Sequence, residues 1–511
     1  MTQSKEEQRQ TSTEQTGSTL FKILGKLSGS DEMSTQTATE MEDMSNIQVV
    51  SPLSGQPQVV GGFDSCPEYA YTDEQLADSA LSLPILTDDH GPPNMTYMLG
   101  KIYHPINHYA EKREYESSMF WFTYRCDFPE INPYGITSDA GWGCMIRSAQ
   151  MLLAQTLRVH YKSRDWRPPY LMTRRRQDPF MRSMLTWFAD YPSMTENVYS
   201  LQNMVAAGIR YDKLPGEWYG PGSACYVIRD LVELHERQQQ KSRTADLKAS
   251  SSSLRGFRVH VAQQGAVYRD IIQVLMTREN KARMDAEMAK KHKENPQAHP
   301  LDLEWEEELI ESVGQVEWDT ALLLLVPLRL GLKTFNEDYL KAVAHTFSFP
   351  QSVGILGGRE RGARWFYGAS SDGQKVFGLD PHTVQSSPRR RTAKVNGKIS
   401  TVVDMTDDYM RSVHTTYPEV FSFLRTDPSI AMGFYCRTQA DMEDLFVRLN
   451  DWKENNPSSP ELFTVADASP DYAANVSSVV DDMLGSSLCM DDDDVQDRDD
   501  AMSEEDDYVL L

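Results

Sequence analysis

SDAGWGCMIR, residues 138–147, decides how the sequence is interpreted. The stretch SAQMLLAQTLRVH follows it directly and predicts a buried helix. Gly141 and Gly143 interrupt regular structure just before Cys144, so Cys144 is expected in the first turn of that helix. The apolar side chains that recur at helical spacing are Ile146, Ala149, Leu153 and Leu157.

A cysteine at this place has two chemical interpretations. The free amides and the dipole at a helix N-terminus stabilise an anion, which lowers a thiol pKa and provides donors for the oxyanion of an acyl-transfer transition state. Cys144 is therefore a candidate nucleophile. The alternative is a small buried apolar residue without chemistry, and the local sequence does not choose between the two.

A thiolate nucleophile requires a general base, usually a histidine that a carboxylate or an amide orients. His382 follows the strand-like run Val376 to Leu379, and Asp380 lies two positions before it. In an extended segment, residues two apart point to one face, and Pro381 suits the end of a strand. The alternative is an ordinary Asp-Pro turn with an incidental histidine.

The segment from Gln351 to Gly368 predicts two strands joined by a glycine-containing loop. Its glycines do not form a phosphate-binding loop, because no Gly-Lys-Ser/Thr and no helix follow them. We therefore interpret it as a hairpin whose loop, Gly357 to Gly362, can move.

The net charge of -24 is concentrated at the two ends of the 511-residue chain. Residues 1–90 contain 15 acidic and 4 basic side chains, and residues 467–511 contain 15 acidic side chains and a single Arg498. The nearly neutral middle gives no electrostatic case for nucleic-acid binding, which requires a basic face. The runs Arg174–Arg176 and Arg389–Arg391 are interpreted as solvated loops.

The cysteines and the apolar segments favour a cytoplasmic protein. The six cysteines are scattered without paired spacing, which favours reduced thiols over a disulfide framework. The start shows no basic and then apolar region typical of a secretory signal. The most apolar run, Ala321 to Val326, is far too short to span a bilayer.

Composition divides the chain into three parts. Residues 1–90 are expected to form a disordered acidic extension, 91–466 an α+β domain, and 467–511 a disordered acidic tail. Two polar segments of the domain, 236–255 and 278–311, are expected to be surface insertions. The amphipathic patch Leu20 to Leu27 could dock on a membrane or a partner.

Six motifs, in order along residues 95–466, resemble the autophagin family of autophagy-related cysteine endopeptidases with a papain-like core. The acidic extensions and the insertions resemble the longer, N-terminally extended branch. The resemblance implies a mixed sheet with helices, no cofactor and no metal. The motifs are WFTYR at 121–125, GWGC at 141–144, WYGP at 218–221, VPLRLG at 326–331, VGILGG at 353–358 and LDPHT at 379–383.

Carried over to this sequence, the resemblance implies a role for each matching residue. It implies Cys144 as nucleophile, His382 as base and then acid, and Asp380 as the residue that orients the imidazole. Tyr124 would help to hold the oxyanion and Arg329 would contact substrate. The implied gate over the cleft consists of Trp218 with the loop residues Gly357, Gly358, Arg359 and Glu360. Many relatives have Gly-Gly-Lys-Pro where this chain has Gly-Gly-Arg-Glu, and without the proline the gate is expected to be more flexible.

The resemblance also implies the substrate. Family members cut ubiquitin-like autophagy modifiers after a glycine near the C-terminus and release them from phosphatidylethanolamine on autophagosomal membranes. A narrow cleft would select glycine by excluding side chains. A binding protein of the same fold with poor turnover is the alternative, and an acyltransferase or transglutaminase with a similar triad has no further support.

The chain ends in EEDDYVLL, residues 504–511. Tyr508 and Leu511 fit a short motif that adds a strand to the modifier and fills two pockets. A C-terminal PDZ ligand and an acidic dileucine signal are the competing interpretations.

Overall fold

The computed structural model describes residues 94–169, 171–245, 256–277, 318, 320–395, 398–415 and 418–470. Several predicted segments lie outside the described residues: the two acidic extensions (apart from 467–470 of the second), the patch at 20–27, the insertion at 278–311 and the terminal motif. Residues 236–245 of the other predicted insertion continue a long helix. Gln and Arg are good helix formers, so a polar, Gln-rich tract does not by itself indicate a loop.

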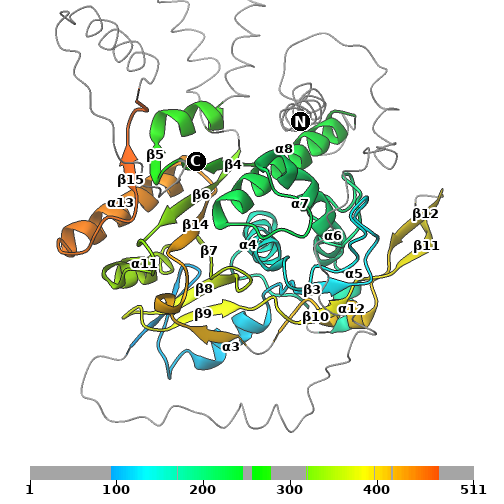
Figure 1. The fold of residues 1–511 in the computed structure, drawn as a ribbon, viewed down its shortest axis with the longest axis horizontal. Coiled ribbons are helices and arrows are strands. Elements are labelled where there is room, and N and C mark those ends of the chain that lie inside the picture. Colours follow the sequence, from blue (N-terminus) through cyan, green and yellow to red (C-terminus); the bar gives the residue numbers. More distant parts are fainter. Residues whose placement is uncertain are drawn as a thin grey trace, which may run out of the picture.

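A nine-stranded mixed sheet forms the centre of the domain (Figure 1). Its main path runs β13-β9-β8-β7-β14-β6-β4, and β1 joins β8 and β2. Among these pairs, β4 with β6 is parallel and the others are antiparallel. The strands are β1 (Thr96–Met98), β2 (Lys101–Tyr103), β4 (Phe257–Val261), β6 (Ala321–Arg329), β7 (Ser352–Gly357), β8 (Arg364–Ser370), β9 (Val376–Leu379), β13 (Glu419–Phe421) and β14 (Ser429–Cys436).

Helices cover both faces of this sheet, so the domain has three layers (Figure 1). Two long helices, α4 and α8, pack on one face, and α11 and α13 pack on the other. The helices include α3 (Tyr109–Ser117), α4 (Cys144–Tyr161), α5 (Met172–Gln177), α6 (Pro179–Trp187), α7 (Leu201–Gly208), α8 (Pro221–Ala245), α11 (Leu340–Thr346), α12 (Asp407–Arg411) and α13 (Gln439–Asn455), with short 3-10 turns at Ile209–Tyr211, Glu337–Tyr339 and Phe423–Arg425. Residues 269–277 are also helical.

The apolar run in β6 shows how the sequence specifies a sheet that is covered twice. Leu323 and Leu325 pack in the core beside α4, whereas Leu322, Leu324 and Val326 pack in the core on the opposite face. All five are completely buried. A strand buried on both faces is continuously apolar instead of alternating, which is the pattern seen here.

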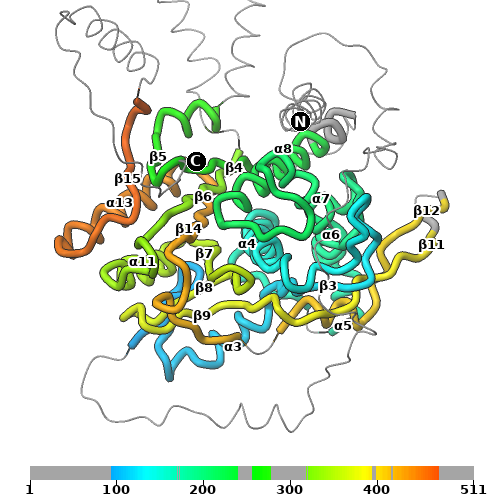
Figure 2. Tube along the Cα trace, in the orientation of Figure 1, coloured from blue at the N-terminus to red at the C-terminus, as the bar shows by residue number. Residues whose placement is uncertain are grey.

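Three small two-stranded sheets complete the described chain. β3 (Tyr124–Cys126) and β10 (Val384–Ser386) form a parallel pair (Figure 1). The hairpin β11 (Arg390–Val395) and β12 (Lys398–Val403) projects from the body, as the tube shows at the right of Figure 2. The parallel pair β5 (Ala266–Tyr268) and β15 (Thr464–Ala466) brings the end of the described chain back to the domain.

The interpretation of the two arginine runs as solvated loops is wrong in part. Arg174–Arg176 lie in helix α5, where the Arg175 guanidinium donates to the Pro169 carbonyl at 2.6 Å. Arg390 and Arg391 belong to strand β11. Arg is a good helix former, so Arg174–Arg176 suit helix α5, whereas Arg390 and Arg391 are placed in a strand by the pairing of β11 with β12.

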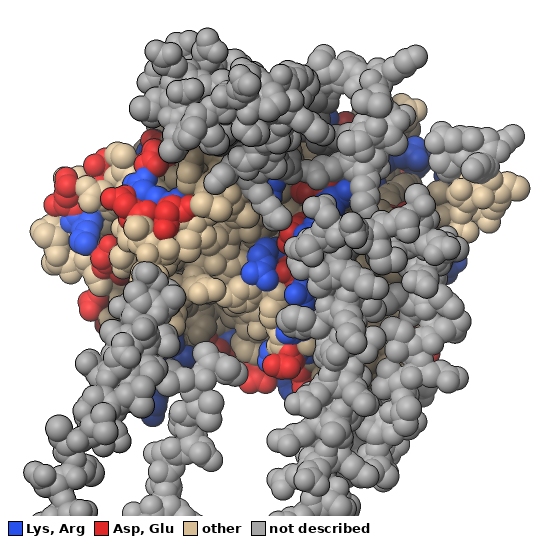
Figure 3. Space-filling model, turned by 90° about the horizontal axis from the view of Figure 1, so that it is seen from above, with Lys and Arg blue, Asp and Glu red and all other residues tan. Residues whose placement is uncertain are grey.

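On the face shown in Figure 3, charged side chains of both signs are interspersed with uncharged surface. No helix in the described part of the chain is long and apolar enough to cross a membrane.

Candidate active site

Cys144 is the first residue of α4, as the sequence predicts, and Gly143 caps the helix. The helix is buried along nearly its whole length, and the Cys144 side chain is completely buried. The first amides of a helix have no partner within the helix. The sulfur therefore stands where backbone donors are available to an anion.

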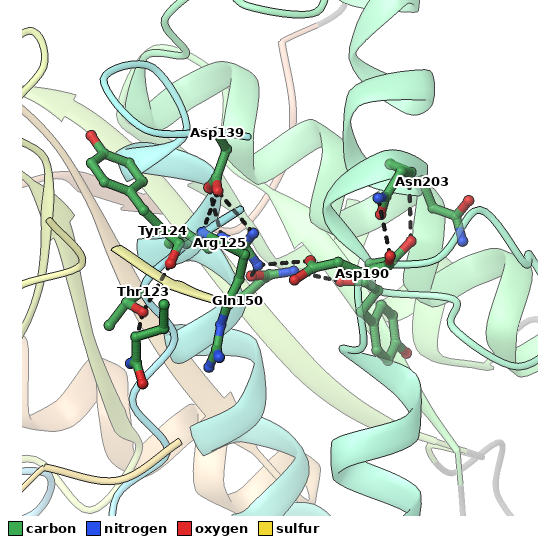
Figure 4. A network of polar contacts seen from close by, with 12 residues as sticks. Thr123, Tyr124, Arg125, Asp139, Gln150, Asp190 and Asn203 are labelled. Atoms are coloured by element: carbon green, nitrogen blue, oxygen red, sulfur yellow. Dashed lines mark hydrogen bonds and ion pairs between the residues drawn. The ribbon is translucent and has the colours of Figure 1, made fainter. Parts of the chain in front are cut away.

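A buried ionic network fixes the loop before Cys144 (Figure 4). The Asp139 carboxylate accepts the Arg125 backbone N–H at 2.6 Å and two guanidinium N–H groups of Arg147 at 2.7 and 3.1 Å. Arg147 also donates to Asp190 at 2.9 Å and to the Gln150 side chain at 3.1 Å. The network ties the first turn of α4 to strand β3, which carries Tyr124.

His382 and Asp380 lie together just beyond the end of β9, so the predicted pairing is confirmed as geometry. Asp380 Oδ1 accepts the His382 backbone N–H at 2.8 Å and makes a short contact with His382 Nδ1. The carboxylate thus orients the imidazole and leaves Nε2 directed away from it.

The WFTYR segment holds this Asp-Pro-His turn in place. The Trp121 indole N–H donates to the Asp380 carbonyl at 2.7 Å, and the Tyr124 backbone N–H donates to the Pro381 carbonyl at 2.9 Å. Parallel pairing of Tyr124 with Val384 continues the contact. Two segments more than 250 residues apart in the sequence are therefore fixed to each other.

Tyr124 is a neighbour of both candidate catalytic groups. Its ring meets the His382 ring edge-on, with the centroids 5.3 Å apart. Burial and the neighbouring Cys144 raise the pKa of Tyr124, so its hydroxyl keeps its proton. The hydroxyl is buried beside the Cys144 sulfur, so its proton can be donated to an anion formed there.

The loop between β7 and β8 closes over the site. The two strands pair with Gly357 opposite Arg364, so the predicted hairpin is confirmed. The Arg361 carbonyl lies 3.0 Å from His382 Nε2, and the backbone N–H of Ala363 faces Cys144, where it favours the thiolate. In this closed state the Gly358 carbonyl accepts the Asp427 N–H at 2.7 Å.

Gly358 is required at the start of this loop. Its φ is +127°, and a Cβ there would lie 2.4 Å from the Gly362 carbonyl oxygen. Arg359, Glu360 and Arg361 are exposed at the tip, where the Gly362 N–H donates to the Arg359 carbonyl at 2.8 Å. The loop is therefore a tight turn with an exposed tip and a buried base.

The electrostatics favour a thiolate and imidazolium pair. Burial alone would raise the pKa of Cys144, but hydrogen bonds from His382 and from the Ala363 N–H outweigh it and lower that pKa. Burial alone would lower the pKa of His382, but the hydrogen bonds to Asp380 and Cys144 raise it to about 9. The pKa of Asp380 is also lowered: the His382 hydrogen bond and the Arg364 charge outweigh burial.

The other predicted site residues in the described chain, Trp218 and Arg329, form no hydrogen bond with Cys144, His382 or Asp380. Trp218 is half-buried just before α8, and its indole N–H is buried without a partner in the described chain. Arg329 is exposed at the end of β6, and its guanidinium donates to the Leu332 carbonyl at 2.5 Å. Tyr508 and Leu511 lie outside the described residues.

Several contributing residues were not assigned a role from the sequence. Asp139 and Arg147 belong to the segment that introduces Cys144, and charged residues beside a buried helix are a signal that could have marked them. Arg364, which forms an ion pair with Asp380 at 2.5 Å, opens an otherwise apolar strand. Only the fold shows which carboxylate each arginine meets.

Two further features concern the cysteines and metals. Cys126, Cys144, Cys225 and Cys436, the cysteines in the described part, are free thiols. Among the described residues no group of three His, Cys, Asp or Glu side chains is arranged to hold a metal ion.

Comparisons with known proteins agree with a peptidase. The model of the peptidase C54 catalytic domain matches residues 109–448. The chain is 30% identical over 380 residues to the cysteine protease ATG4B of Xenopus laevis, covering 74% of this chain and 85% of that protein. It is also 30% identical over 380 residues to ATG4B of Gallus gallus, covering 74% and 86%. It is 31% identical over 350 residues to the cysteine protease ATG4a of Arabidopsis thaliana, covering 68% and 63%.

The fold, the buried thiol and these relatives define a cysteine-type peptidase. Its relatives are autophagy proteases, and the same general role applies to this chain. The chain belongs to the peptidase C54 family.

Proposed function

We propose that this peptidase cleaves ubiquitin-like autophagy modifiers after a glycine near their C-terminus and releases them from phosphatidylethanolamine. The observation that carries the proposal is the convergence of Cys144, His382 and Asp380 under the β7–β8 loop. We further propose that it acts in the cytoplasm and meets autophagosomal membranes through its lipid-linked substrate. The catalytic domain would span residues 91–466 between the two acidic extensions.

In the proposed reaction the Cys144 thiolate attacks the carbonyl carbon of the glycine, and the bond from this carbon to the next nitrogen breaks. The first amides of α4 and the Tyr124 hydroxyl stabilise the oxyanion, because they are donors already in position. His382 donates its Nε2 proton to the departing amine, and Asp380 stabilises the imidazolium. A water molecule deprotonated by His382 then hydrolyses the thioester and releases the glycine carboxylate.

Substrate must displace the closed loop before this reaction. The Arg361 carbonyl takes the hydrogen-bonding position at His382 Nε2, and the Cys144 side chain is completely buried. We infer that Gly357, Gly358, Arg359 and Glu360 move, together with Trp218, to admit a slim glycine-containing tail. A side chain at the cut position would collide with the walls of such a cleft, which selects glycine.

Contacts outside the cleft would retain the body of the modifier. Arg329 is exposed, and only one guanidinium nitrogen donates to the Leu332 carbonyl, so its other donors could bind an acidic or carbonyl group of the substrate. The terminal motif with Tyr508 and Leu511 would bind a second surface. A long tail that joins two weak contacts raises their combined affinity.

The closed loop also supports a second candidate function. A protein that keeps its nucleophile covered would capture the modifier through exposed surfaces and cleave it slowly. Loop closure changes the rate of turnover and leaves the chemistry the same, so the two functions differ in kcat.

One experiment tests both. Purified protein is mixed with a modifier precursor, or with modifier conjugated to phosphatidylethanolamine in liposomes, and the products are resolved by intact mass spectrometry. Product that ends at the glycine, formed repeatedly by each enzyme molecule and absent with Cys144→Ser, supports the peptidase. Binding without more than one turnover supports the low-turnover alternative, and cleavage by Cys144→Ser refutes the assigned nucleophile.

A further inference from the structure

Arg364 makes three contacts that join the closing loop to the candidate catalytic carboxylate. It is the first residue of β8, and one guanidinium N–H donates to the Gly362 carbonyl at 2.7 Å. A second nitrogen, Nη2, lies 2.5 Å from Asp380 Oδ2. The guanidinium plane also lies over the Phe421 ring, 4.4 Å from its centroid. A planar fork with several donors makes such simultaneous contacts, whereas a single ammonium group does not.

The two oxygens of Asp380 have different partners. Oδ1 accepts the backbone N–H and contacts the imidazole Nδ1 of His382, and Oδ2 pairs with Arg364. A carboxylate held at one oxygen can still rotate, whereas contacts at both oxygens fix its plane. The orientation of the imidazole therefore depends on Arg364 through Asp380.

A second carboxylate, on the neighbouring strand β13, adds negative charge near Asp380, and the positive charge of Arg364 opposes it. Glu419 lies in β13, which pairs with β9, and its side chain is exposed at the edge of the sheet beside the site. Burial and the negative charge of Asp380 raise the pKa of Glu419, and Arg364 and His382 oppose this rise. Arg364 from β8, Glu419 from β13 and His382 from the turn after β9 are the charged groups that face Asp380.

We propose that Arg364 is a positioning residue of the catalytic triad. Its guanidinium fixes the plane of the Asp380 carboxylate and keeps that carboxylate ionised. Through its hydrogen bond to the Gly362 carbonyl, it also links the orientation of Asp380 to closure of the loop. This inference rests on the proposed roles of Cys144, His382 and Asp380. It goes beyond them because it gives a function to a residue outside the six motifs and explains how the loop and the triad communicate.

The substitution Arg364→Met removes the charge and both hydrogen bonds but keeps an apolar chain against Phe421. Without the guanidinium, Asp380 binds a proton at a higher pH, because burial and Glu419 both disfavour its charge. His382 then loses its counter-ion, and the Cys144 thiolate forms only at higher pH. The rate of Cys144 alkylation by iodoacetamide rises with pH on the acidic side of its profile (the acid limb). We expect the midpoint of this rise to shift upward by about one pH unit. We also expect kcat for a modifier precursor to fall about tenfold, well short of the ~10⁴-fold loss that accompanies removal of a triad carboxylate.

Two further variants separate charge from geometry. Arg364→Lys keeps the charge but cannot reach Gly362 and Asp380 together, so its acid limb should match wild type while kcat remains lowered several-fold. Arg411→Met is the matched control: its side chain is 61% exposed, and it pairs with Asp408 on the surface at 3.4 Å. Its pH profile and kcat should be those of wild type, because exposed pairs contribute little.

The measurement is the alkylation rate of Cys144 against pH, followed by peptide mass spectrometry, alongside kcat and the melting temperature. An Arg364→Met protein that is folded and has the wild-type acid limb would overturn the proposal, because a purely structural arginine changes stability alone. If Arg364→Met does not fold, wild-type kcat in Arg364→Lys overturns it instead. Alkylation needs no substrate, so a wild-type enzyme that cleaves no modifier would refute the proposed substrate and leave this test intact.

Discussion

Gly143→Ala tests whether the buried network before α4 positions the nucleophile. Gly143 has an ordinary backbone conformation, with φ of -79°, so an alanine there is not strained by its backbone. Its Cβ, however, would lie 2.3 Å from Asp139 Oδ2 and 2.7 Å from Asp139 Cβ. Asp139 cannot move away freely, because Arg125 and Arg147 hold its carboxylate on both oxygens.

The expected cost follows from these contacts. Overpacking a dense core costs about 1–3 kcal/mol, and each buried hydrogen bond that is lost adds about 1–3 kcal/mol. A total of about 3 kcal/mol lowers the melting temperature of a domain of roughly 300 residues by about 5 °C. Because Asp139 also holds strand β3, we expect misplacement of Cys144 and Tyr124 and a fall in kcat/KM of about 100-fold.

Gly141→Ala is the matched control two residues away. Gly141 has φ of +87°, but a Cβ there meets nothing within 4 Å. This substitution therefore adds backbone strain of about 1 kcal/mol without a steric collision, and it should lower the melting temperature by about 2 °C. We expect its loss of kcat/KM to be small by comparison.

The assays are thermal unfolding by circular dichroism and cleavage of a modifier precursor at saturating and limiting substrate. If Gly143→Ala retains wild-type stability and activity, or if the two substitutions have equal effects, the network does not position the nucleophile. A loss of stability without a loss of activity would restrict the network to folding.

The remaining predictions concern the triad, the pH profile, the gate and the tail. Asp380→Asn should lower kcat by two to four orders of magnitude with little change in melting temperature, measured with the precursor; near-normal turnover would mean that another group orients His382. Because His382 must carry a proton and its pKa is about 9, kcat/KM should decline as the pH rises through about 9, and a decline already complete near pH 7 would contradict this. Trp218→Ala should relax the selectivity for glycine in a panel of peptides, whereas an unfolded variant would make Trp218 a core residue. A synthetic 500–511 peptide should bind the isolated modifier with micromolar affinity that weakens as salt rises, and Tyr508→Ala should abolish this binding; no saturable binding would favour the PDZ or dileucine interpretation.

Local sequence was sufficient where one segment determines its own geometry. The two glycines and the helical spacing placed Cys144 at the start of α4, because capping and periodicity are local properties. The hairpin from Ser352 to Ser370 followed from two apolar runs and a glycine-containing loop. The facing side chains of Asp380 and His382 followed from their spacing at the end of a strand.

Contacts between distant segments could not be obtained in this way. The hydrogen bond from Trp121 to Asp380 joins residues 259 positions apart, and the strand order that creates it has no local signal. The ion pair between Arg364 and Asp380 depends on β8 lying beside β9. The closed loop is a further case, because the contact of the Arg361 carbonyl with His382 involves a backbone atom that carries no sequence information.

A covalent trap provides the most direct test of the central claim. A modifier in which propargylamine replaces the glycine at the cut site places its alkyne carbon where the scissile carbonyl carbon would lie. The account predicts a single adduct, mapped by peptide mass spectrometry to Cys144, which is absent in Cys144→Ser and much slower to form in His382→Ala. An adduct at Cys126, Cys225 or Cys436 instead, or one that Cys144→Ser still forms, would contradict it.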